Sequence, residues 1–265
     1  MPHRVQSPSQ VRLSEIPTRA ESFHSDRPQA EDDFRALRDE LIELQNVLYA
    51  QRTDGLLVVL QAMDAGGKDS TIRKVFRGVN PQGVRVSSFK APSKEERAHD
   101  FLWRIHQAVP AKGMIGVFNR SHYEDVLVAR VDKLVAEEVW RSRYEQINDF
   151  ERLLTDSGTR ILKFYLHISL DEQKKRFQKR LDVPEKNWKF DPRDLDKRRD
   201  WDKYMAAFED VFLHCSPDTA PWYIIPADQK WYRNLAISRV IVETLRQMDP
   251  QFPAAQEGLD GITIE

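Results

Sequence analysis

Residues 57 to 71 constrain this chain more than any other stretch. They read Leu-Val-Val-Leu-Gln-Ala-Met-Asp-Ala-Gly-Gly-Lys-Asp-Ser-Thr. The apolar run predicts a buried strand, the Gly66-Gly67 pair predicts a tight turn, and the residues after Lys68 favour a helix. At the start of such a helix, unpaired backbone N–H groups and the positive end of the helix dipole attract anions. The stretch therefore predicts a loop that binds phosphate.

This loop departs at two positions from the usual phosphate-loop pattern, G-x-x-x-x-G-K-[ST]. Ala62 stands where the first glycine is usual, and Asp69 stands where a hydroxyl residue usually follows the lysine. A simple glycine-rich turn with an exposed lysine fits the same residues, but the order of strand, loop and helix favours phosphate binding. Asp64 would repel a bound phosphate. Its presence makes sense if it holds a metal ion or orients the attacking group.

The composition fits one large α/β domain. The chain has 265 residues, of which 40% are hydrophobic and 31% charged, enough for a sizeable core. A net charge of −1 argues against a dedicated nucleic-acid binder. The sequence contains no apolar run of transmembrane length and no apolar signal segment. The single cysteine, Cys215, can form neither an internal disulfide nor a cysteine metal cluster. We expect a soluble, cytoplasmic protein that binds neither nucleic acid nor membranes.

Strand and helix patterns alternate along most of the chain. Residues 1–31 form a polar arm without sustained periodicity, which we expect to be irregular or mobile. Strands are expected at 56–62, 84–89, 114–118, 161–168 and 222–226. Helices are expected from Asp33, from the loop to Gly78, over 98–109 behind a capping box at Ser93 and Glu96, and over 136–156 and 230–248. This alternation predicts a single domain, residues 32–265, with a five-stranded parallel sheet and helices on both faces.

In open parallel sheets, ligands bind beyond the carboxyl ends of the strands. The third expected strand ends in Asn-Arg-Ser-His-Tyr-Glu-Asp, residues 119–125. Arg120 could form a surface ion pair with Glu124, but beside the loop we favour a phosphate-binding guanidinium. Asn119 is neutral where an acidic metal ligand is common, so the metal candidates are Asp64 and Asp125, and after them Glu124. No second His or Cys lies at ligand spacing from His122, which favours a packed or hydrogen-bonded histidine.

The fourth expected strand is followed by a strongly basic segment. Residues 174–181 carry five cations and no acid, and residues 172–203 contain twelve Lys or Arg against eight Asp or Glu, a net charge of +4. A solvated helix face would account for such a run. Its position over a phosphate loop instead favours a lid, named here the basic lid (residues 172–203), which neutralises phosphate and excludes water. The aromatic residues within it fit closure on a base and simple lid packing equally well.

Three segments together resemble the family-2 polyphosphate kinases: residues 57–86, 118–131 and 220–234. The resemblance extends over about residues 33–247 and leaves the polar arm and the last residues uncovered. The wording of residues 119–125 resembles the subgroup that phosphorylates both nucleoside mono- and diphosphates. Other members carry Asp at the position of Asn119 and Trp at that of His122, which leaves the metal role of position 119 open.

The resemblance implies a three-layer, thymidylate-kinase-like P-loop fold, assembled as a homo-oligomer (dimer or tetramer). The implied reaction is reversible transfer of a phosphoryl group between inorganic polyphosphate and AMP, ADP or ATP, with GMP and GDP as further candidates, and with Mg²⁺ or Mn²⁺ as cofactor. The implied catalytic residues are Asp64, Lys68 and Arg120, and the implied metal ligands are Asp64 and Asp125. Phosphate contacts are predicted for Ala65, Gly66, Gly67, Lys68, Asp69, Ser70, Arg73, Asn119, Arg120, Lys175 and Arg180, and nucleotide contacts in the basic lid for Lys186, Trp188 and Lys189.

Two other classes of function compete with this interpretation. An ordinary ATP-dependent nucleoside or nucleotide kinase would carry almost the same loop, and a trial with ATP and no polyphosphate distinguishes it. A non-enzymatic nucleotide- or nucleic-acid-binding module is the second. The guanine-reading Asn-Lys-x-Asp motif is absent, and acidic residues interrupt the cations of the basic lid, which argues against a nucleic-acid surface.

The role implied for Arg180 is testable. If its guanidinium clamps polyphosphate, Arg180→Ala should raise the KM for polyphosphate more than it weakens nucleotide binding, because one charge-assisted contact with the polyanion is lost. Steady-state kinetics with each substrate varied in turn measures both effects. An unchanged KM for polyphosphate would refute the role.

Overall fold

The apolar runs of the sequence pair into one parallel sheet of five strands, as predicted. The computed structural model describes residues 2–258, 262 and 264. Its strands lie in the order β2-β3-β1-β4-β5, and each neighbouring pair is parallel. Their bounds are Gly55–Gln61 for β1, Val84–Ser88 for β2, Ile115–Asn119 for β3, Thr159–His167 for β4 and Trp222–Pro226 for β5. The expected strands differ from these by at most two residues at either end.

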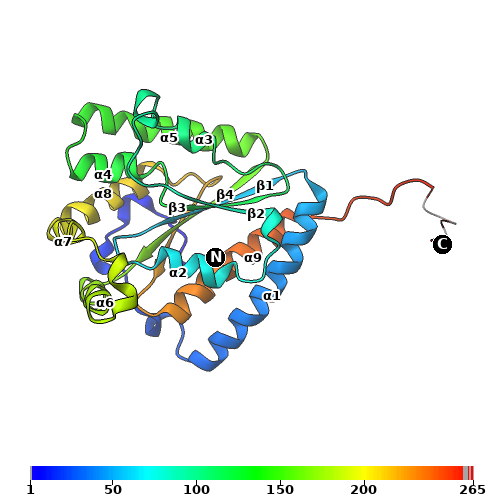
Figure 1. The fold of residues 1–265 in the computed structure, drawn as a ribbon, viewed down its shortest axis with the longest axis horizontal. Coiled ribbons are helices and arrows are strands. Elements are labelled where there is room, and N and C mark those ends of the chain that lie inside the picture. The colour runs from blue at the N-terminus through cyan, green and yellow to red at the C-terminus, as the bar shows by residue number, and fades with distance from the viewer. Residues whose placement is uncertain (1, 259–261, 263, 265) are drawn as a thin grey trace.

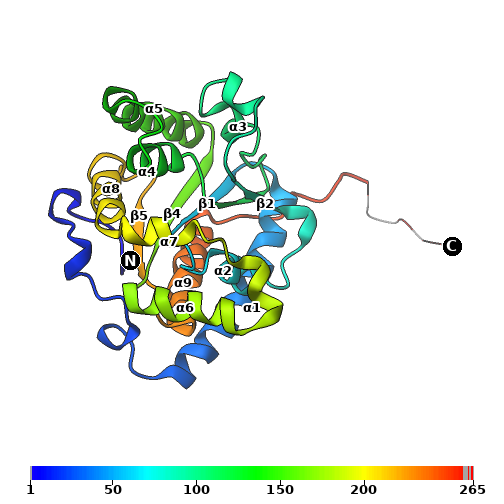
Figure 2. The same ribbon diagram turned by 60° about the vertical axis from the view of Figure 1, so that its left-hand side comes forward.

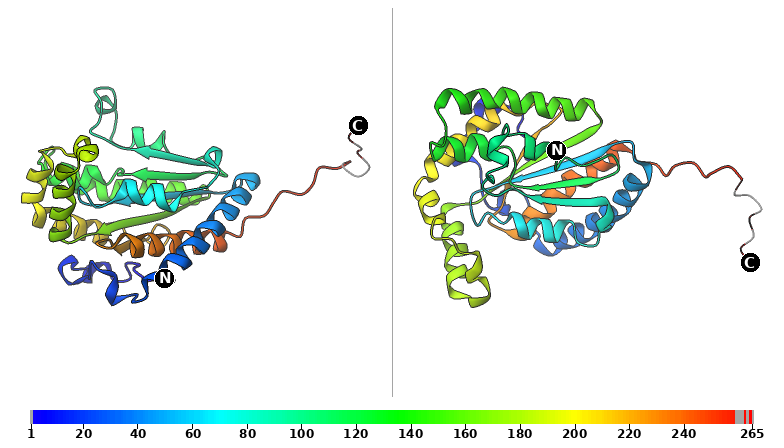
Figure 3. Two further views of the ribbon diagram at one scale, coloured as in Figure 1. Left: turned by 60° about the horizontal axis from the view of Figure 1, so that its bottom comes forward. Right: turned by 45° about the horizontal axis from the view of Figure 1, so that its top comes forward.

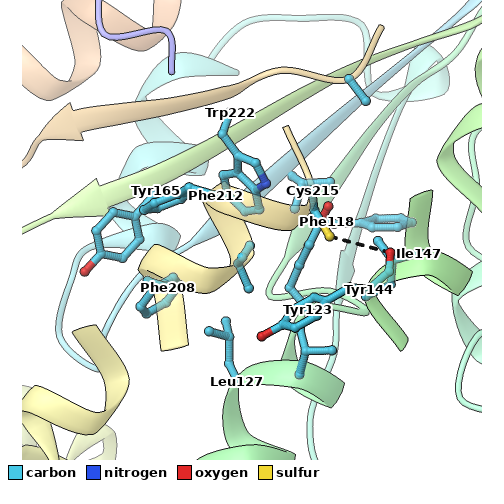
Figure 4. Packing of buried hydrophobic residues seen from close by; sticks show 14 of the residues in the cluster. Phe118, Tyr123, Leu127, Tyr144, Ile147, Tyr165, Phe208, Phe212, Cys215 and Trp222 are labelled. Atoms are coloured by element: carbon cyan, nitrogen blue, oxygen red, sulfur yellow. Dashed lines mark hydrogen bonds between the residues drawn. The ribbon is translucent and has the colours of Figure 1, made fainter. Parts of the chain in front are cut away.

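Helices cover both faces of the sheet (Figure 1). One layer contains α1 (Arg27–Gln51), α2 (Lys68–Val75) and α9 (Lys230–Met248), and the other contains α4 (Glu124–Val131), α5 (Glu137–Asp156) and α8 (Trp201–His214). Alternate residues of β1 supply the two cores, because side chains of a strand alternate between the faces. Leu57 and Val59 pack with α4, α5 and α8, whereas Leu56, Val58 and Leu60 pack with α1 and α9. Figure 4 shows the aromatic part of the first core.

Two further helices, α6 (Leu170–Asp182) and α7 (Asp194–Arg199), lie outside these layers. They are joined by the 3₁₀ helix η6 (Pro184–Lys189). Figures 2 and 3 show them together at one end of the sheet, opposite the end from which the C-terminal segment leaves. This end is where β1 runs into α2, so it is the carboxyl end of the strands. The predicted basic lid therefore lies at the edge where ligands bind in such folds.

The structure corrects one boundary of the polar arm. Helix α1 begins at Arg27 rather than at Asp33, because the Asp26 side chain accepts a hydrogen bond from the backbone of Gln29 and Pro28 occupies the first turn. Asp at the N-cap and Pro just inside a helix are typical start signals. The six added residues are mostly polar and exposed, so hydrophobic periodicity alone does not reveal this first turn.

The rest of the arm is irregular but packed against the domain. It has three 3₁₀ turns, η1 (Pro8–Gln10), η2 (Leu13–Glu15) and η3 (Ala20–Ser22). The backbone N–H of Val5 donates to the carbonyl of Trp222, and that of Ile224 donates to the carbonyl of His3, so the arm pairs with the outer edge of β5. The Leu13 side chain is only 1% exposed. Its hydrophobic contacts and backbone bonds explain why a polar, aperiodic sequence keeps one conformation here.

The expected helix over 98–109 is wrong. Only η5 (Glu96–Ala98) and the four-residue α3 (Trp103–His106) form there. The capping box does exist, since Ser93 and Glu96 exchange side-chain-to-backbone hydrogen bonds. His99 is extended, however, and the Asp100 carboxylate accepts a bond from the backbone of Leu102. Such local bonds offer the backbone an alternative to helix. A further 3₁₀ turn, η4 (Pro81–Gly83), precedes β2.

None of the helices in the described part of the chain is both long and apolar enough to cross a membrane.

The packing of the arm leads to a stability prediction. Leu13→Ala should lower the free energy of unfolding by about 2–5 kcal/mol, the usual cost of a cavity at a buried leucine. Urea denaturation of both proteins measures the difference, with Val11→Ala as a less buried neighbour expected to cost less. A loss below about 1 kcal/mol for Leu13→Ala would show that the arm contributes little to the fold.

Candidate active site

The predicted phosphate loop has a backbone that few other residues could adopt. Ala65 has φ +62° and Gly67 has φ +103°, both in the left-handed region. The backbone N–H of Gly66 donates to the carbonyl of Met63 at 2.9 Å. A Cβ atom on Gly66 would lie 2.4 Å from the Cβ of Ala62, so the second glycine is required by the close approach of the loop to its own start. The loop therefore presents the unpaired N-terminal turn of α2 to the carboxyl edge of the sheet.

Asp64, Lys68 and Arg120, the three predicted catalytic residues, come together in this loop. Arg120 Nη2 donates to Asp64 Oδ1 at 2.7 Å, and Lys68 Nζ donates to the carbonyl of Ala62 at 2.9 Å. Arg120 itself has φ +64°, and such strain is common at functional sites. The first turn of the adjoining helix therefore starts from a residue whose conformation sets the direction of its guanidinium.

Burial and neighbouring charges set the protonation states of these groups. Burial would raise the pKa of Asp64, but Arg120, Lys68 and Lys197 together hold it below the usual value. Burial and the positive charge of Arg120 lower the pKa of Lys68 to about 8. At neutral pH the pair is therefore an ionised carboxylate and a mostly protonated ammonium. This is the combination that binds an anion and directs it.

Glu124, rather than Asp125, shares a cavity with Asp64. The cavity is small and is lined in part by Asp64, Arg120, Glu124, Lys197 and Tyr204. Glu124 Oε2 lies 3.6 Å from Arg120 Nη1, so the surface ion pair considered from the sequence does form, but within the site.

Asp125 lies among other cations instead. Its carboxylate is 3.6 Å from Arg143 and 3.8 Å from Arg104, and burial raises its pKa. It does not line the cavity. Of the predicted metal candidates, the structure thus brings Asp64 and Glu124 together and directs Asp125 elsewhere.

Asp64 and Glu124 suit a magnesium ion that is held mainly by substrate. The described residues contain no group of three His, Cys, Asp or Glu side chains that could hold a metal ion by themselves. Mg²⁺ in phosphate sites usually takes one or two carboxylates and completes its shell with water and phosphate oxygens. Two carboxylates flanking Arg120 match that donor set, so Asp64 and Glu124 are the residues that would hold the ion.

The two departures from the usual loop pattern compensate for one another. Asn119 Nδ2 donates to Asp69 Oδ1 at 2.7 Å. A common phosphate loop has a hydroxyl residue at the first position and an acid at the second strand end, and both contact the metal. Here the acid has moved to the loop and an amide stands at the strand end. The two side chains bind each other, which ties the start of α2 to the end of β3.

A buried polar network supports the Arg120 segment from below. Lys163 of β4 is fully buried and donates to Glu151 at 2.5 Å, to Tyr123 at 2.9 Å and to the carbonyl of Cys215 at 2.9 Å. Glu151 of α5 also contacts His122 Nε2 at 3.2 Å and accepts from Tyr123. Figure 4 shows Tyr123 and Cys215 in the surrounding core. His122 is therefore a hydrogen-bonded core residue, as expected.

The first turns of α6 are fixed on the loop. Gln173 is buried and donates to the carbonyl of Asp64 at 2.9 Å. Arg176 Nη1 donates to the carbonyls of Ala65 and Gly66, and its Nη2 donates to those of Ala227 and Asp228. The start of the predicted basic lid is therefore part of the site wall.

The rest of the basic lid holds its predicted residues more loosely. Arg180 Nη1 donates to the carbonyl of Lys189 at 3.0 Å and lies 3.3 Å from Asp194. Trp188 is 77% exposed, with Lys189 Nζ 4.8 Å from its ring centre. Lys186 is half-buried, whereas Lys175 of α6 and Arg73 of α2 are exposed. These residues surround the loop without converging on one point.

Two residues of the site were not predicted from the sequence. Lys197 Nζ lies 3.4 Å from Asp64 Oδ2, although it was only one of many cations in the basic lid. Arg233 is fully buried against the loop. A signal for it exists in the sequence, because an arginine inside the apolar face of the last helix needs a polar partner.

The buried network gives a prediction of its own. Glu151→Ala should cost about 3–5 kcal/mol, because it leaves the Lys163 charge buried without a partner. The double variant Glu151→Leu/Lys163→Met should recover much of that loss, since it removes both charges. Urea unfolding measures all three, with Glu138→Ala on the exposed face of α5 as the matched control. Equal losses for the single and double variants would contradict the charge argument.

Comparisons with known proteins agree with this geometry. The family model described as polyphosphate kinase 2 matches residues 24–253. An "AMP/ADP-polyphosphate phosphotransferase" of Meiothermus ruber is 51% identical over 99% of each chain, and an "ADP-polyphosphate phosphotransferase" of Rhodopseudomonas palustris is 45% identical over 94% of this chain and 91% of that one. The crystal structure of polyphosphate kinase 2 from Arthrobacter aurescens superposes with a TM-score of 0.93 at 40% identity, covering 97% of this chain and 92% of that chain. The chain belongs to the polyphosphate kinase 2 family.

Proposed function

We propose that the protein transfers phosphoryl groups reversibly from inorganic polyphosphate to nucleoside mono- and diphosphates, converting AMP to ADP and ADP to ATP. The observation that carries this proposal is the meeting of Asp64, Lys68 and Arg120 at a phosphate loop beside a basic helical segment. Family membership and the names of the similar proteins support polyphosphate as donor.

The reaction needs positioning and charge neutralisation more than covalent chemistry. The attacking terminal phosphate of the nucleotide is already an anion, so no strong base is required. Lys68 and Arg120 would offset repulsion between this anion and the donor, and Asp64, fixed by Arg120, would set the approach of the attacking oxygen. A Mg²⁺ or Mn²⁺ ion bound by Asp64 and Glu124 would supply further neutralisation. The basic lid would exclude water, which prevents hydrolysis of the donor.

The acceptor range follows from the subgroup to which the Arg120 segment is similar. Asn119 and His122 are the residues that distinguish this subgroup in the sequence. In the structure, Asn119 binds Asp69, and His122 binds Glu151 in the core. The relative from Meiothermus ruber carries both AMP and ADP in its name, which supports use of both acceptors here. A homo-oligomer, dimer or tetramer, is the assembly that we propose from the same resemblance.

The test is ATP and ADP formation by the purified protein with Mg²⁺, long-chain polyphosphate and either AMP or ADP. Product from both acceptors is expected. Product from ADP alone would keep the donor and overturn the dual acceptor range. Activity that appears only when ATP replaces polyphosphate would show an ordinary nucleotide kinase. Removal of the metal with a chelator should abolish turnover, and readdition of Mg²⁺ or Mn²⁺ should restore it.

Variants of the loop test the proposed roles. Lys68→Ala and Asp64→Ala should each lower kcat by at least about two orders of magnitude, because each removes a charge aimed at the transferring phosphate. Circular dichroism and the thermal midpoint show whether the variants remain folded. Lys112→Ala, at the opposite edge of the sheet, is the matched control. Turnover close to that of the unmodified protein in either loop variant would remove that residue from the mechanism.

A further inference from the structure

The outer side of the phosphate loop carries more positive charge than its neighbours neutralise. Arg176 and Lys179 of α6 lie there with Lys230 and Arg233 of α9, close enough that Arg176, Arg233 and Lys179 all lower the pKa of Lys230, after burial itself. Two acids lie nearby. Glu172 is bound to Arg176 at 2.7 Å, and the Asp228 carboxylate accepts bonds from Thr18 and from the backbone of Ser169.

Arg233 has a guanidinium that is buried but not fully bonded. Its Nε and Nη2 donate to the side chain of Asn234, and Nη2 also lies 3.2 Å from Ser70 Oγ. Its Nη1 is buried and has no hydrogen-bond partner. Leaving a charged donor unsatisfied in the interior is costly. An acceptor brought by a ligand would remove that cost.

The unpartnered nitrogen faces the phosphate loop. A Cβ atom on Gly67 would lie 2.3 Å from Arg233 Nη1 and 3.4 Å from Arg176 Nη1. Gly67 is also the N-cap of α2, and no side chain caps that helix. The free N–H groups of its first turn and Arg233 Nη1 are therefore donors to the same small region, and the missing side chain of Gly67 leaves the space between them open.

The two neighbouring arginines have different roles. Both halves of the Arg176 guanidinium are occupied by backbone carbonyls, so Arg176 shapes the loop. Arg233 keeps one donor free. Burial and the charge of Arg176 lower the pKa of Arg233 to about 9, which still leaves the side chain protonated at neutral pH. Its positive charge is thus available to a ligand.

The two sides of the loop also differ in charge. The inner side contains Asp64 and Glu124 among its cations, a mixture that suits a metal ion with a nucleotide phosphate. On the outer side, the two acids are already bound, and Lys179 and Lys230 extend the positive surface toward solvent. A surface of this kind favours a ligand that carries one negative charge after another along its length.

We propose that Arg233, Lys230 and Lys179 form a second phosphate subsite, which holds the donor chain beyond the phosphoryl group being transferred. This inference rests on the proposed function, because it names the part of the donor that this side of the loop binds. Arg233 Nη1 donates to the phosphate next to the loop, and the two exposed lysines bind phosphates farther along the chain.

The test measures donor and acceptor kinetics in three variants of the full chain: Arg233→Gln, Arg233→Lys and Lys179→Gln/Lys230→Gln. Lys112→Gln serves as the control, since it removes one exposed lysine charge at the other edge of the sheet. The KM for long-chain polyphosphate should rise about tenfold or more in Arg233→Gln, as expected for loss of one charge-assisted contact. The KM for ADP should change little, and Arg233→Lys should recover part of the loss.

The exposed pair keeps the test decisive if Arg233→Gln fails to fold. For Lys179→Gln/Lys230→Gln, the KM for long-chain polyphosphate should rise more than that for tripolyphosphate, because the short donor does not reach both lysines. Calorimetric titration with tripolyphosphate and with long-chain polyphosphate, without nucleotide, checks the same order in binding.

The outcomes separate the inference from the proposed function. If the unmodified protein uses polyphosphate and the KM for that donor is unchanged in the lysine pair and in a folded Arg233→Gln, the subsite is refuted and the function stands. If donor and ADP KM values rise equally, Arg233 supports the loop rather than the donor, and the subsite is again refuted. If the unmodified protein does not consume polyphosphate at all, the proposed function itself is overturned.

Discussion

The guanidinium of Arg176 connects the elements on which the site depends. It donates to four backbone carbonyls, two in the phosphate loop and two just after β5. Carbonyls at the ends of parallel strands and in tight loops are otherwise difficult to satisfy without water. One planar side chain with several fixed donors can meet this need. The loop, the end of β5 and the start of α6 therefore share one anchor, and the position of the loop depends on it.

Around this anchor, the charges are distributed unevenly. Asp64 and Arg120 bind one another on the inner side of the loop, and Lys68 is held against the carbonyl of Ala62. These contacts fix the side chains before any substrate arrives, which lowers the cost of organising the site during reaction. The fully buried Lys163–Glu151 pair extends the same rigidity into the core beneath Arg120. The active site is thus the surface layer of a polar network that continues into the domain.

Much of the fold was predictable, because its strands are short apolar runs that end in turn residues. The phosphate loop was predictable because its chemistry is local in sequence. The choice between Glu124 and Asp125 was not, since adjacent residues on α4 point about 100° apart and the start of that helix depends on the left-handed Arg120. Arg233 was missed because it lies far along the chain in an apolar helix. The expected helix over 98–109 failed because periodicity does not register a competing bond from Asp100.

The pairing of the polar arm with β5 has a consequence for how the protein meets other chains. An edge strand with free N–H and C=O groups is a template for pairing with another strand. Residues 3–5 occupy that template on β5, whereas β2 at the other end of the sheet remains largely exposed. The sheet is therefore open to strand addition at one edge only. Loss of the arm would expose a second adhesive edge, so in this protein a polar segment without regular structure acts as protection against aggregation.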